Sequence, residues 1–219
     1  LAGADLVLEL PVTGALSSAE GFAATGVAIL SHFCDSLSFG AENADSTALM
    51  SIAKALLSPA FSERLKLQLQ KGFSFPAARQ AALTEMGMDA SLLSLPNNIL
   101  AVEYCKAMLS QGCPMKPFPI HREGSYHAEI ADSENPSATA VRNLMLIAHN
   151  WRSCVPKQVR EIFDNAPLHA IHAGERAILA KLRTMEPEDL AKLPDCSEGL
   201  CDRLYAAARQ ARSLEELYD

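Results

Sequence analysis

The sequence predicts an α/β fold in which a parallel sheet carries a helical insertion and is followed by an all-helical C-terminal region. Short apolar runs at Ala4–Val12 and Ser36–Phe39 are separated by one stretch of helical periodicity. A third strand pattern follows at Met115–Arg122, whereas only helical patterns occur beyond Trp151. Parallel neighbours need a crossover connection, so strands separated by helices favour a parallel sheet.

The N-terminal part is expected to hold a buried strand and then a helix. Residues Ala4–Val12 are rich in apolar side chains and are bounded by glycine and proline, a pattern typical of a buried strand. Ser17-Ser-Ala-Glu20 matches a capping box, in which a serine and a glutamate satisfy free N–H groups at a helix start. Phe22, Ile29 and Phe33 follow at near-helical spacing, and we expect them to face inward.

The middle of the chain is expected to be mainly helical. Two or three helices should occupy residues 46–88, with a break at Gly72 and a restart near Pro76, because proline suits a first helical turn. Since a strand pattern resumes later, this helical segment is interpreted as an insertion. The next helix, Ile99–Ser110, is opened by Pro96-Asn97-Asn98, whose amide side chains can cap it.

The C-terminal part should consist of helices only. A helix begins after Ser137, which is a suitable capping residue. We place a domain boundary shortly afterwards, so that residues 1–150 form the sheet domain and residues 151–219 an all-helical domain. The helices expected in the second domain are Lys157–Asn165, Glu175–Met185 and Glu198–Arg212.

Composition favours a globular, cytoplasmic protein. Hydrophobic residues make up 49% and charged residues 21% of the 219 positions, close to the globular average. No apolar run approaches the roughly 20 residues that span a bilayer, and the first residues lack the features of a signal peptide. Six cysteines without a Cys-x-x-Cys pair indicate reduced thiols. We therefore expect no membrane association.

The charge of the chain excludes a broad class of nucleic-acid binders. A formal net charge of −7 disfavours a non-specific DNA-binding protein, which needs a basic surface to displace counterions. A basic patch on one face remains compatible with tRNA. Lysine and arginine recur at Arg64–Arg79, Lys106–Arg122 and Arg176–Arg183.

Three residues at predicted strand or helix ends are candidates for ligand binding. The glycine-rich phosphate motifs, the G-x-S-x-G elbow and the H-E-x-x-H pair are all absent, and no residues have the spacing of a metal site. Ligands of open α/β sheets bind beyond the carboxyl ends of strands, where Gly40, Asn97 and Arg122 are expected. Glycine permits close approach, asparagine can read a base edge, and arginine suits phosphate. A turn glycine, a helix cap and a surface arginine are the alternatives.

A second candidate is the helix start at Ser137, where Thr139 and Arg142 follow within about one turn. Hydroxyls and free N–H groups at a helix N-terminus favour phosphate, and an arginine beside them adds charge. A capped helix with an exposed arginine explains the pattern equally well. The run Lys71–Arg79 places two cations around a Gly/Pro turn, and we interpret it as a helix junction rather than an anion site.

Taken together, these segments resemble the tRNA(Met) cytidine acetate ligase family. The similarity covers most of residues 1–146 and continues in the C-terminal stretches Ser197–Leu204 and Ser213–Glu216. The segments that carry it in the first part are Gly3–Pro11, Ser18–Ala23, Phe39–Glu42, Lys71–Arg79, Pro96–Leu100, Met115–Pro117, Arg122 and Ser137–Arg142.

The resemblance implies a Rossmann-like nucleotidyltransferase fold and an ATP-dependent ligase. Such enzymes activate acetate as acetyl-adenylate and form N4-acetylcytidine at the wobble position of elongator tRNA(Met). The implied partners are therefore ATP, acetate and elongator tRNA(Met), with Mg²⁺ carried on the nucleotide. By the same resemblance, Gly40, Asn97 and Arg122 match ATP-binding positions. Ser137, Thr139 and Arg142 correspond to a phosphate-side motif.

ATP is a substrate of that reaction and not a resident cofactor, and Mg²⁺ enters with its phosphates.

The chain departs from the family pattern in one respect. The His-x-Gly-His-type signature of the family, which precedes the Gly-Ala-Asp region, occurs nowhere in these 219 residues. Its histidines would stabilise charge developing on the phosphates, so we expect an N-terminally truncated, inactive chain whose catalytic residues are unknown. Two alternatives stay open: a small-molecule adenylyltransferase of cofactor synthesis, and a non-catalytic RNA-binding fragment.

Overall fold

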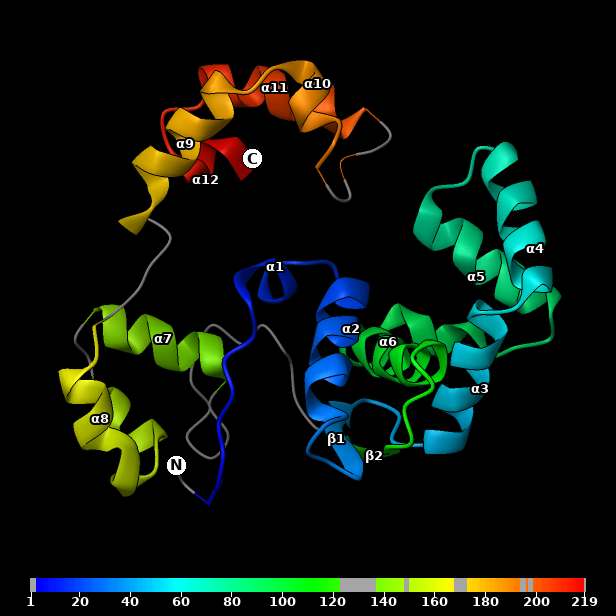
Figure 1. Cartoon of the computed structure of the whole chain (residues 1–219), viewed down its shortest axis with the longest axis horizontal. Coiled ribbons are helices and arrows are strands. Elements are labelled where there is room, and N and C mark those ends of the chain that lie inside the picture. Colours follow the sequence, from blue (N-terminus) through cyan, green and yellow to red (C-terminus); the bar gives the residue numbers. More distant parts are fainter. Residues whose placement is uncertain are drawn as a thin grey trace. The chain divides into compact units, whose positions relative to one another are not determined.

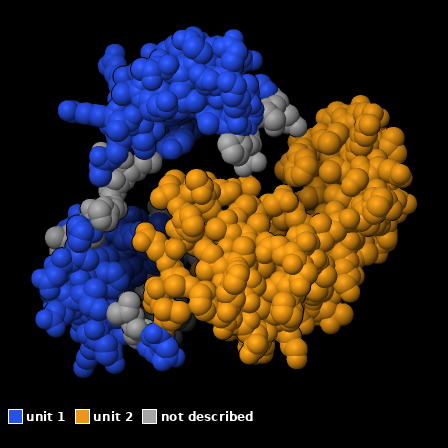
Figure 2. Space-filling view, viewed as in Figure 1, with its two compact units in different colours: residues 1–5, 127–219 blue, residues 6–126 orange. Residues whose placement is uncertain are grey.

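The computed structural model describes residues 3–122, 137–147, 150–167, 173–193, 196 and 199–218. The chain divides into two compact units, shown in Figure 2. We call residues 6–126 the sheet unit, and residues 1–5 with 127–219 the helical unit. This division places residues 127–150 with the C-terminal helices, whereas the sequence suggests a boundary after residue 150. That domain boundary stays a prediction.

The sheet unit contains two parallel strands, as the sequence predicts. Strand β1 (Ser36–Ala41) pairs with β2 (Lys116–His121), and the register runs from Ser36 opposite Lys116 to Ala41 opposite His121. The helix α6 (Pro96–Ser110) precedes β2 along the chain and packs against β1 (Figure 1). Because the strands are parallel, their carboxyl ends meet at one edge of the sheet.

The predicted N-terminal strand at Ala4–Val12 is wrong. The described residues before Pro11 form no strand, and a short helix, α1 (Val12–Ala15), follows them. Leu6 and Val7 are 63% and 64% exposed. Apolar composition favours a strand, but a strand also needs a neighbouring backbone to complete its hydrogen bonds. Within the described residues, β1 and β2 pair only with each other.

The helix α2 (Ala19–Leu30) forms where predicted, but its start differs from the expected capping box. Its N-cap is Ser18, whose side chain makes no capping hydrogen bond. Glu20, the expected partner in the box, instead forms an ion pair with Lys106 of α6, with a distance of 3.0 Å between Nζ and Oε1. The carboxylate therefore joins two helices and does not satisfy the helix start.

The buried face of α2 also differs from the prediction. Ala23, Gly26 and Val27 are buried, and these small side chains let α2 pack closely on α6. Phe33 was expected to face inward but is 67% exposed, because it lies beyond the last helical residue. The helical spacing that predicts an inward Phe33 applies only while the helix continues.

The predicted helical insertion is confirmed. Gly72 has a φ of +88°, a left-handed conformation that glycine adopts without strain, and Pro76 lies in the first turn of the following helix. A short 3₁₀ helix, η1 (Ala90–Ser94), leads from the insertion to α6. The three helices of the insertion are α3 (Ser46–Leu56), α4 (Pro59–Gln70) and α5 (Phe75–Glu85).

The core of the sheet unit lies where α3, α5 and α6 meet β1. Leu49, Ile52, Leu83 and Val102 are buried there with at most 1% of their surface exposed. Cys105 of α6 belongs to the same cluster, and burial raises the pKa of its thiol to about 12. A thiol with that pKa stays protonated at neutral pH, which agrees with the interpretation of the cysteines as reduced structural residues. All six cysteines are free.

The helical unit contains helices only, within its described residues, as predicted. The helix capped by Ser137 forms as expected, whereas the predicted start at Glu198 lies outside the described residues. No described helix is long and apolar enough to cross a membrane. The helices of this unit are α7 (Ala138–Leu146), η2 (Trp151–Cys154), η3 (Lys157–Val159), α8 (Arg160–Asn165), α9 (Glu175–Thr184), α10 (Pro187–Leu190), α11 (Leu200–Gln210) and α12 (Leu214–Tyr218).

Candidate functional site

Gly40 and Arg122 lie side by side at the carboxyl edge of the sheet. Gly40 is the second-last residue of β1, and Arg122 directly follows β2. The backbone N–H of Arg122 donates to the carbonyl of Ala41 over 2.9 Å. A Cβ atom added at Gly40 would lie 3.5 Å from Cδ of Arg122. A side chain at position 40 would therefore contact the arginine side chain.

Asn97 joins the same edge through Glu42, the residue that follows β1. One carboxylate oxygen of Glu42 accepts from the side-chain amide of Asn97 over 2.7 Å and from its backbone N–H over 3.2 Å. The other oxygen accepts from the backbone N–H of Asn98 over 2.7 Å. These N–H groups belong to the first turn of α6, so Glu42 caps that helix.

The two asparagines therefore do not cap α6 themselves, which corrects the sequence interpretation. Asn97 and Asn98 are 8% and 2% exposed. The side-chain oxygen of Asn98 accepts from the backbone N–H of Asn43 over 2.8 Å. The residue before the helix, Leu95, has no side chain able to cap, so the free N–H groups take a partner from a distant part of the chain.

The surroundings of Glu42 stabilise its charged form. Partial burial raises the pKa of its carboxyl group, but hydrogen bonds from the Asn97 side chain and from the backbone N–H groups of Glu42, Asn97 and Asn98 together outweigh that effect. The pKa of Glu42 therefore lies below its ordinary value. Sequence reasoning missed this residue. The helix start without a capping side chain at Leu95 was the signal that a remote cap was needed.

The second group of predicted site residues lies at the start of α7, in the helical unit. The Ser137 hydroxyl accepts from the backbone N–H of Ala140 over 3.0 Å, as a local cap does. Thr139 and Arg142 are exposed. The two groups thus belong to different units, and their assembly into one site stays a prediction.

The cations of the Lys71–Arg79 run are engaged in contacts within the sheet unit. Arg79 lies 3.6 Å from a carboxylate oxygen of Glu103, which is 5% exposed and also pairs with Lys106 at 2.7 Å. Lys71 donates to the side chain of Gln68 over 3.3 Å. These contacts support the interpretation of the run as a helix junction.

Two arginines of the helical unit are likewise used to hold helix ends together. Arg183 donates to the carbonyls of Ala208 and Ala211 over 3.0 and 2.6 Å, and Arg209 donates to the carbonyl of Met185 over 3.1 Å. Cations near a helix C-terminus satisfy its free carbonyl groups. These guanidinium groups therefore join α9 to α11.

No cluster of three or more histidine, cysteine, aspartate or glutamate side chains suited to a metal ion occurs among the described residues. The polar groups that the structure gathers at the sheet edge are instead an arginine, a buried amide and a charged carboxylate that orients the amide. Such a set can bind an anion beside a hydrogen-bonding group, which is the pattern that a nucleotide requires.

Comparisons with known proteins place these features in context. Residues 1–219 match the family model described as HIGH Nucleotidyl Transferase. A tRNA(Met) cytidine acetate ligase from Alkaliphilus metalliredigens is 36% identical over 242 residues, which cover 98% of this chain and 57% of that protein. The enzyme of the same name from Bacillus subtilis is 32% identical over 237 residues, which cover 99% of this chain and 56% of the Bacillus subtilis protein.

Solved structures show the same similarity. The apo crystal structure of Thermotoga maritima TmcAL superposes with a TM-score of 0.84 at 28% identity, covering 98% of this chain and 55% of that one. The structure of Thermotoga maritima TmcAL bound with alpha-thio ATP gives a TM-score of 0.81 at 30% identity, and the match covers 98% of this chain and 54% of that one. The chain thus spans a little over half the length of the relatives that it matches.

Proposed function

Because the chain belongs to the HIGH nucleotidyl transferase family, we propose that it forms the ATP-binding part of a tRNA(Met) cytidine acetate ligase. In the proposed reaction, an acetate oxygen attacks the α-phosphorus of ATP, and pyrophosphate leaves. The amine N4 of the wobble cytidine in elongator tRNA(Met) then attacks the acetyl carbonyl carbon, and AMP leaves as the acetyl–oxygen bond breaks. One proton is released from the amine.

The observation that carries the proposal is the gathering of Gly40, Asn97 and Arg122 at one edge of the sheet. The contacts at Ala41 and Glu42 join these residues, which come from three separate segments of the chain. This edge is where ligands bind in open α/β sheets. The related Thermotoga maritima structure with alpha-thio ATP supports the choice of ATP as the ligand.

We assign the nucleoside side of ATP to Gly40 and Asn97. The missing side chain of Gly40 gives a flat base or ribose room to approach the strand. The side-chain amide N–H of Asn97 donates to Glu42. We propose that the side-chain oxygen of Asn97 accepts a hydrogen bond from a nucleoside hydroxyl or amine. Glu42 is thus proposed as a positioning residue, since it acts through Asn97.

We assign the phosphates to Arg122, Ser137, Thr139 and Arg142. A guanidinium group forms two parallel hydrogen bonds with phosphate, and the start of α7 adds backbone N–H groups and a hydroxyl. We place Mg²⁺ on the ATP phosphates, where that ion commonly enters enzymes of phosphate chemistry.

The chain by itself is proposed to bind ATP without turning it over. The His-x-Gly-His signature does not occur in these 219 residues, which therefore do not themselves supply that electrostatic stabilisation of the developing phosphate charge. The second candidate is a non-catalytic RNA-binding role. The two candidates differ because only the first requires a nucleotide site.

Calorimetric titration of the chain with Mg²⁺ and ATP tests the proposal. Arg122→Ala and Arg142→Ala should each weaken ATP binding by about tenfold, because a hydrogen bond to a charged group contributes about 1.5 kcal/mol or more. Arg152→Ala is the matched control, since this exposed arginine is paired with Asp164 and is not among the residues assigned to ATP. Unchanged affinity in both test variants would contradict the site, and no ATP binding at all would favour the RNA-binding candidate.

A further inference from the structure

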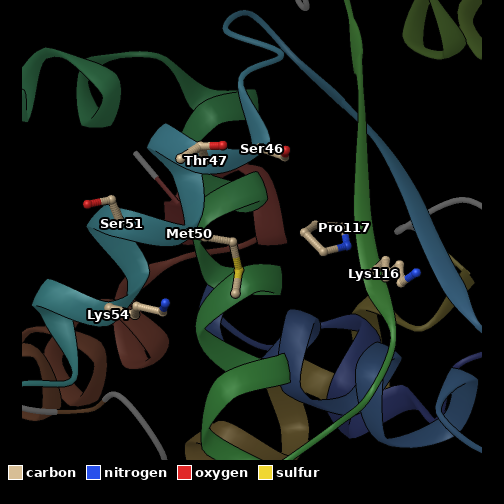
Figure 3. Close-up of a pocket in the computed structure, with 7 residues that line it drawn as sticks. All are labelled: Ser46, Thr47, Met50, Ser51, Lys54, Lys116 and Pro117. Atoms are coloured by element: carbon tan, nitrogen blue, oxygen red, sulfur yellow. The ribbon is translucent and has the colours of Figure 1, made fainter.

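A hollow of about 600 Å³ lies within the sheet unit, between α3 and the start of β2 (Figure 3). Its lining combines three kinds of side chain: hydroxyl groups, lysines and apolar groups. They include Ser46, Ser51, Lys54, Lys116, Met50 and Pro117. In Figure 3, Lys54 extends from α3 toward the side of the hollow that β2 forms.

The hollow is cationic although the whole chain carries a formal net charge of −7. Lys54 and Lys116 are both exposed, and neither forms an ion pair within the described part of the chain. No acidic residue lines the hollow. The nearby carboxylate of Asp45 accepts from two backbone N–H groups at the start of α3, over 2.8 and 3.1 Å. Both lysines are therefore available to an anion.

One end of the hollow lies far from the edge assigned to ATP. Lys116 begins β2 and Arg122 follows the end of that strand, so the two residues lie about 20 Å apart at a rise of about 3.3 Å per residue. Ser46, in contrast, begins α3 shortly after β1 ends. The lining of the hollow thus extends from near the carboxyl edge toward the opposite end of the strands.

We propose that this hollow binds the sugar–phosphate backbone of an RNA substrate. The proposal deepens the proposed function, because it rests on RNA as the acetyl acceptor. A hollow of this volume exceeds the needs of one phosphate, and its two lysines come from different elements. Lysines and hydroxyl groups contact phosphate and the ribose 2′-hydroxyl, whereas Met50 and Pro117 offer an apolar surface to the sugar.

Binding of an elongator tRNA(Met) transcript to the full chain, measured by filter binding at several salt concentrations, tests the proposal. Lys54→Glu and Lys116→Glu should each weaken binding by about tenfold and lower the slope of log affinity against log salt by about 1. Lys66→Glu is the matched control, because Lys66 is an exposed lysine of α4 outside the hollow. It makes the same change in charge and should alter binding by less than about twofold.

Equal losses in all three variants, or no loss in the two hollow variants, would overturn the proposal. The proposal would also be overturned if both hollow variants lost binding of inorganic pyrophosphate but kept tRNA binding, because the hollow would then be a small-anion site. ATP titration in the absence of RNA separates this proposal from the proposed function. If the chain binds ATP but neither lysine substitution changes its affinity for tRNA, the nucleotide site stands and the proposed RNA-binding hollow is refuted.

Discussion

The helices α6 and α7 both begin beside residues proposed to contact ATP, but their first turns are satisfied in different ways. The cap of α6 is Glu42, which lies 55 residues before Asn97 in the sequence. The cap of α7 is Ser137, the residue directly before the helix. A remote cap joins the helix to the end of β1, so the position of Asn97 depends on the fold. A local cap forms wherever the helix does.

The largest effect is expected from removing the remote cap. Glu42→Ala leaves the first-turn N–H groups of Asn97 and Asn98 without their charged partner, which should cost about 2 kcal/mol of unfolding free energy. Chemical denaturation measures that loss. Hydrogen exchange followed by mass spectrometry should show faster exchange in the peptide that contains the start of α6.

Glu63→Ala provides the control for that experiment. Glu63 is an exposed glutamate of α4, so its removal changes the net charge by the same amount without touching a helix cap. It should shift the unfolding free energy by less than about 0.5 kcal/mol. Equal stability of the two variants would show that the carboxylate of Glu42 contributes nothing to α6, and its role as a positioning residue for Asn97 would fall with it.

The difference between these caps also explains what the sequence could predict. Ser137 was identified as a cap because capping by serine is a local pattern that needs only the neighbouring residues. Glu42 was missed because its partners lie in another segment, and no local pattern relates the two. The strand at Ala4–Val12 failed for a related reason: apolar composition is local, but the pairing that completes a strand is not.

The arrangement at the sheet edge could be predicted from the sequence in part, through a rule about the fold. Gly40 and Arg122 were expected near each other because the rule that parallel strands end at one edge converts sequence positions into a place in the fold. The structure confirms that proximity, whereas their contact with ATP stays a proposal. The hollow beside α3 could not be foreseen, since Lys54 belongs to no motif and meets Lys116 of the Met115–Pro117 segment only when α3 packs beside β2.

A smaller effect is expected from the local cap. Ser137→Ala removes the acceptor for the backbone N–H of Ala140 and should cost α7 about 1 kcal/mol. Ser137→Asp should keep most of that stability, because aspartate caps a helix as well as serine does. Ser18→Ala is a structural control, since the Ser18 side chain makes no capping hydrogen bond in α2.

Hydrogen exchange over the α7 peptide distinguishes these variants. Faster exchange is expected in Ser137→Ala alone, with the peptide at the start of α6 unchanged, because the two caps belong to different units. If Ser137→Ala instead loosened α6 as strongly as α7, the contrast between a local and a remote cap would be refuted.

The smallest effect, and the one that tests the electrostatic basis of the remote cap, is a dependence of stability on pH. The pKa of Glu42 is lower in the folded chain than its ordinary value of 4.5. The contribution of Glu42 to the free energy of unfolding is therefore fully present above about pH 4.5 and is lost as the pH falls through the folded pKa.

Asp89, whose pKa is also lowered, by hydrogen bonds from Ser91, adds its own acid dependence to the stability of the sheet unit. The parent chain and Glu42→Gln share that background, so unfolding free energies measured between pH 6 and pH 3 should fall more steeply in the parent by an amount that belongs to Glu42 alone. Parallel pH profiles would mean that the hydrogen bonds to Glu42 do not depend on its charge, and that a neutral amide satisfies the start of α6 equally well.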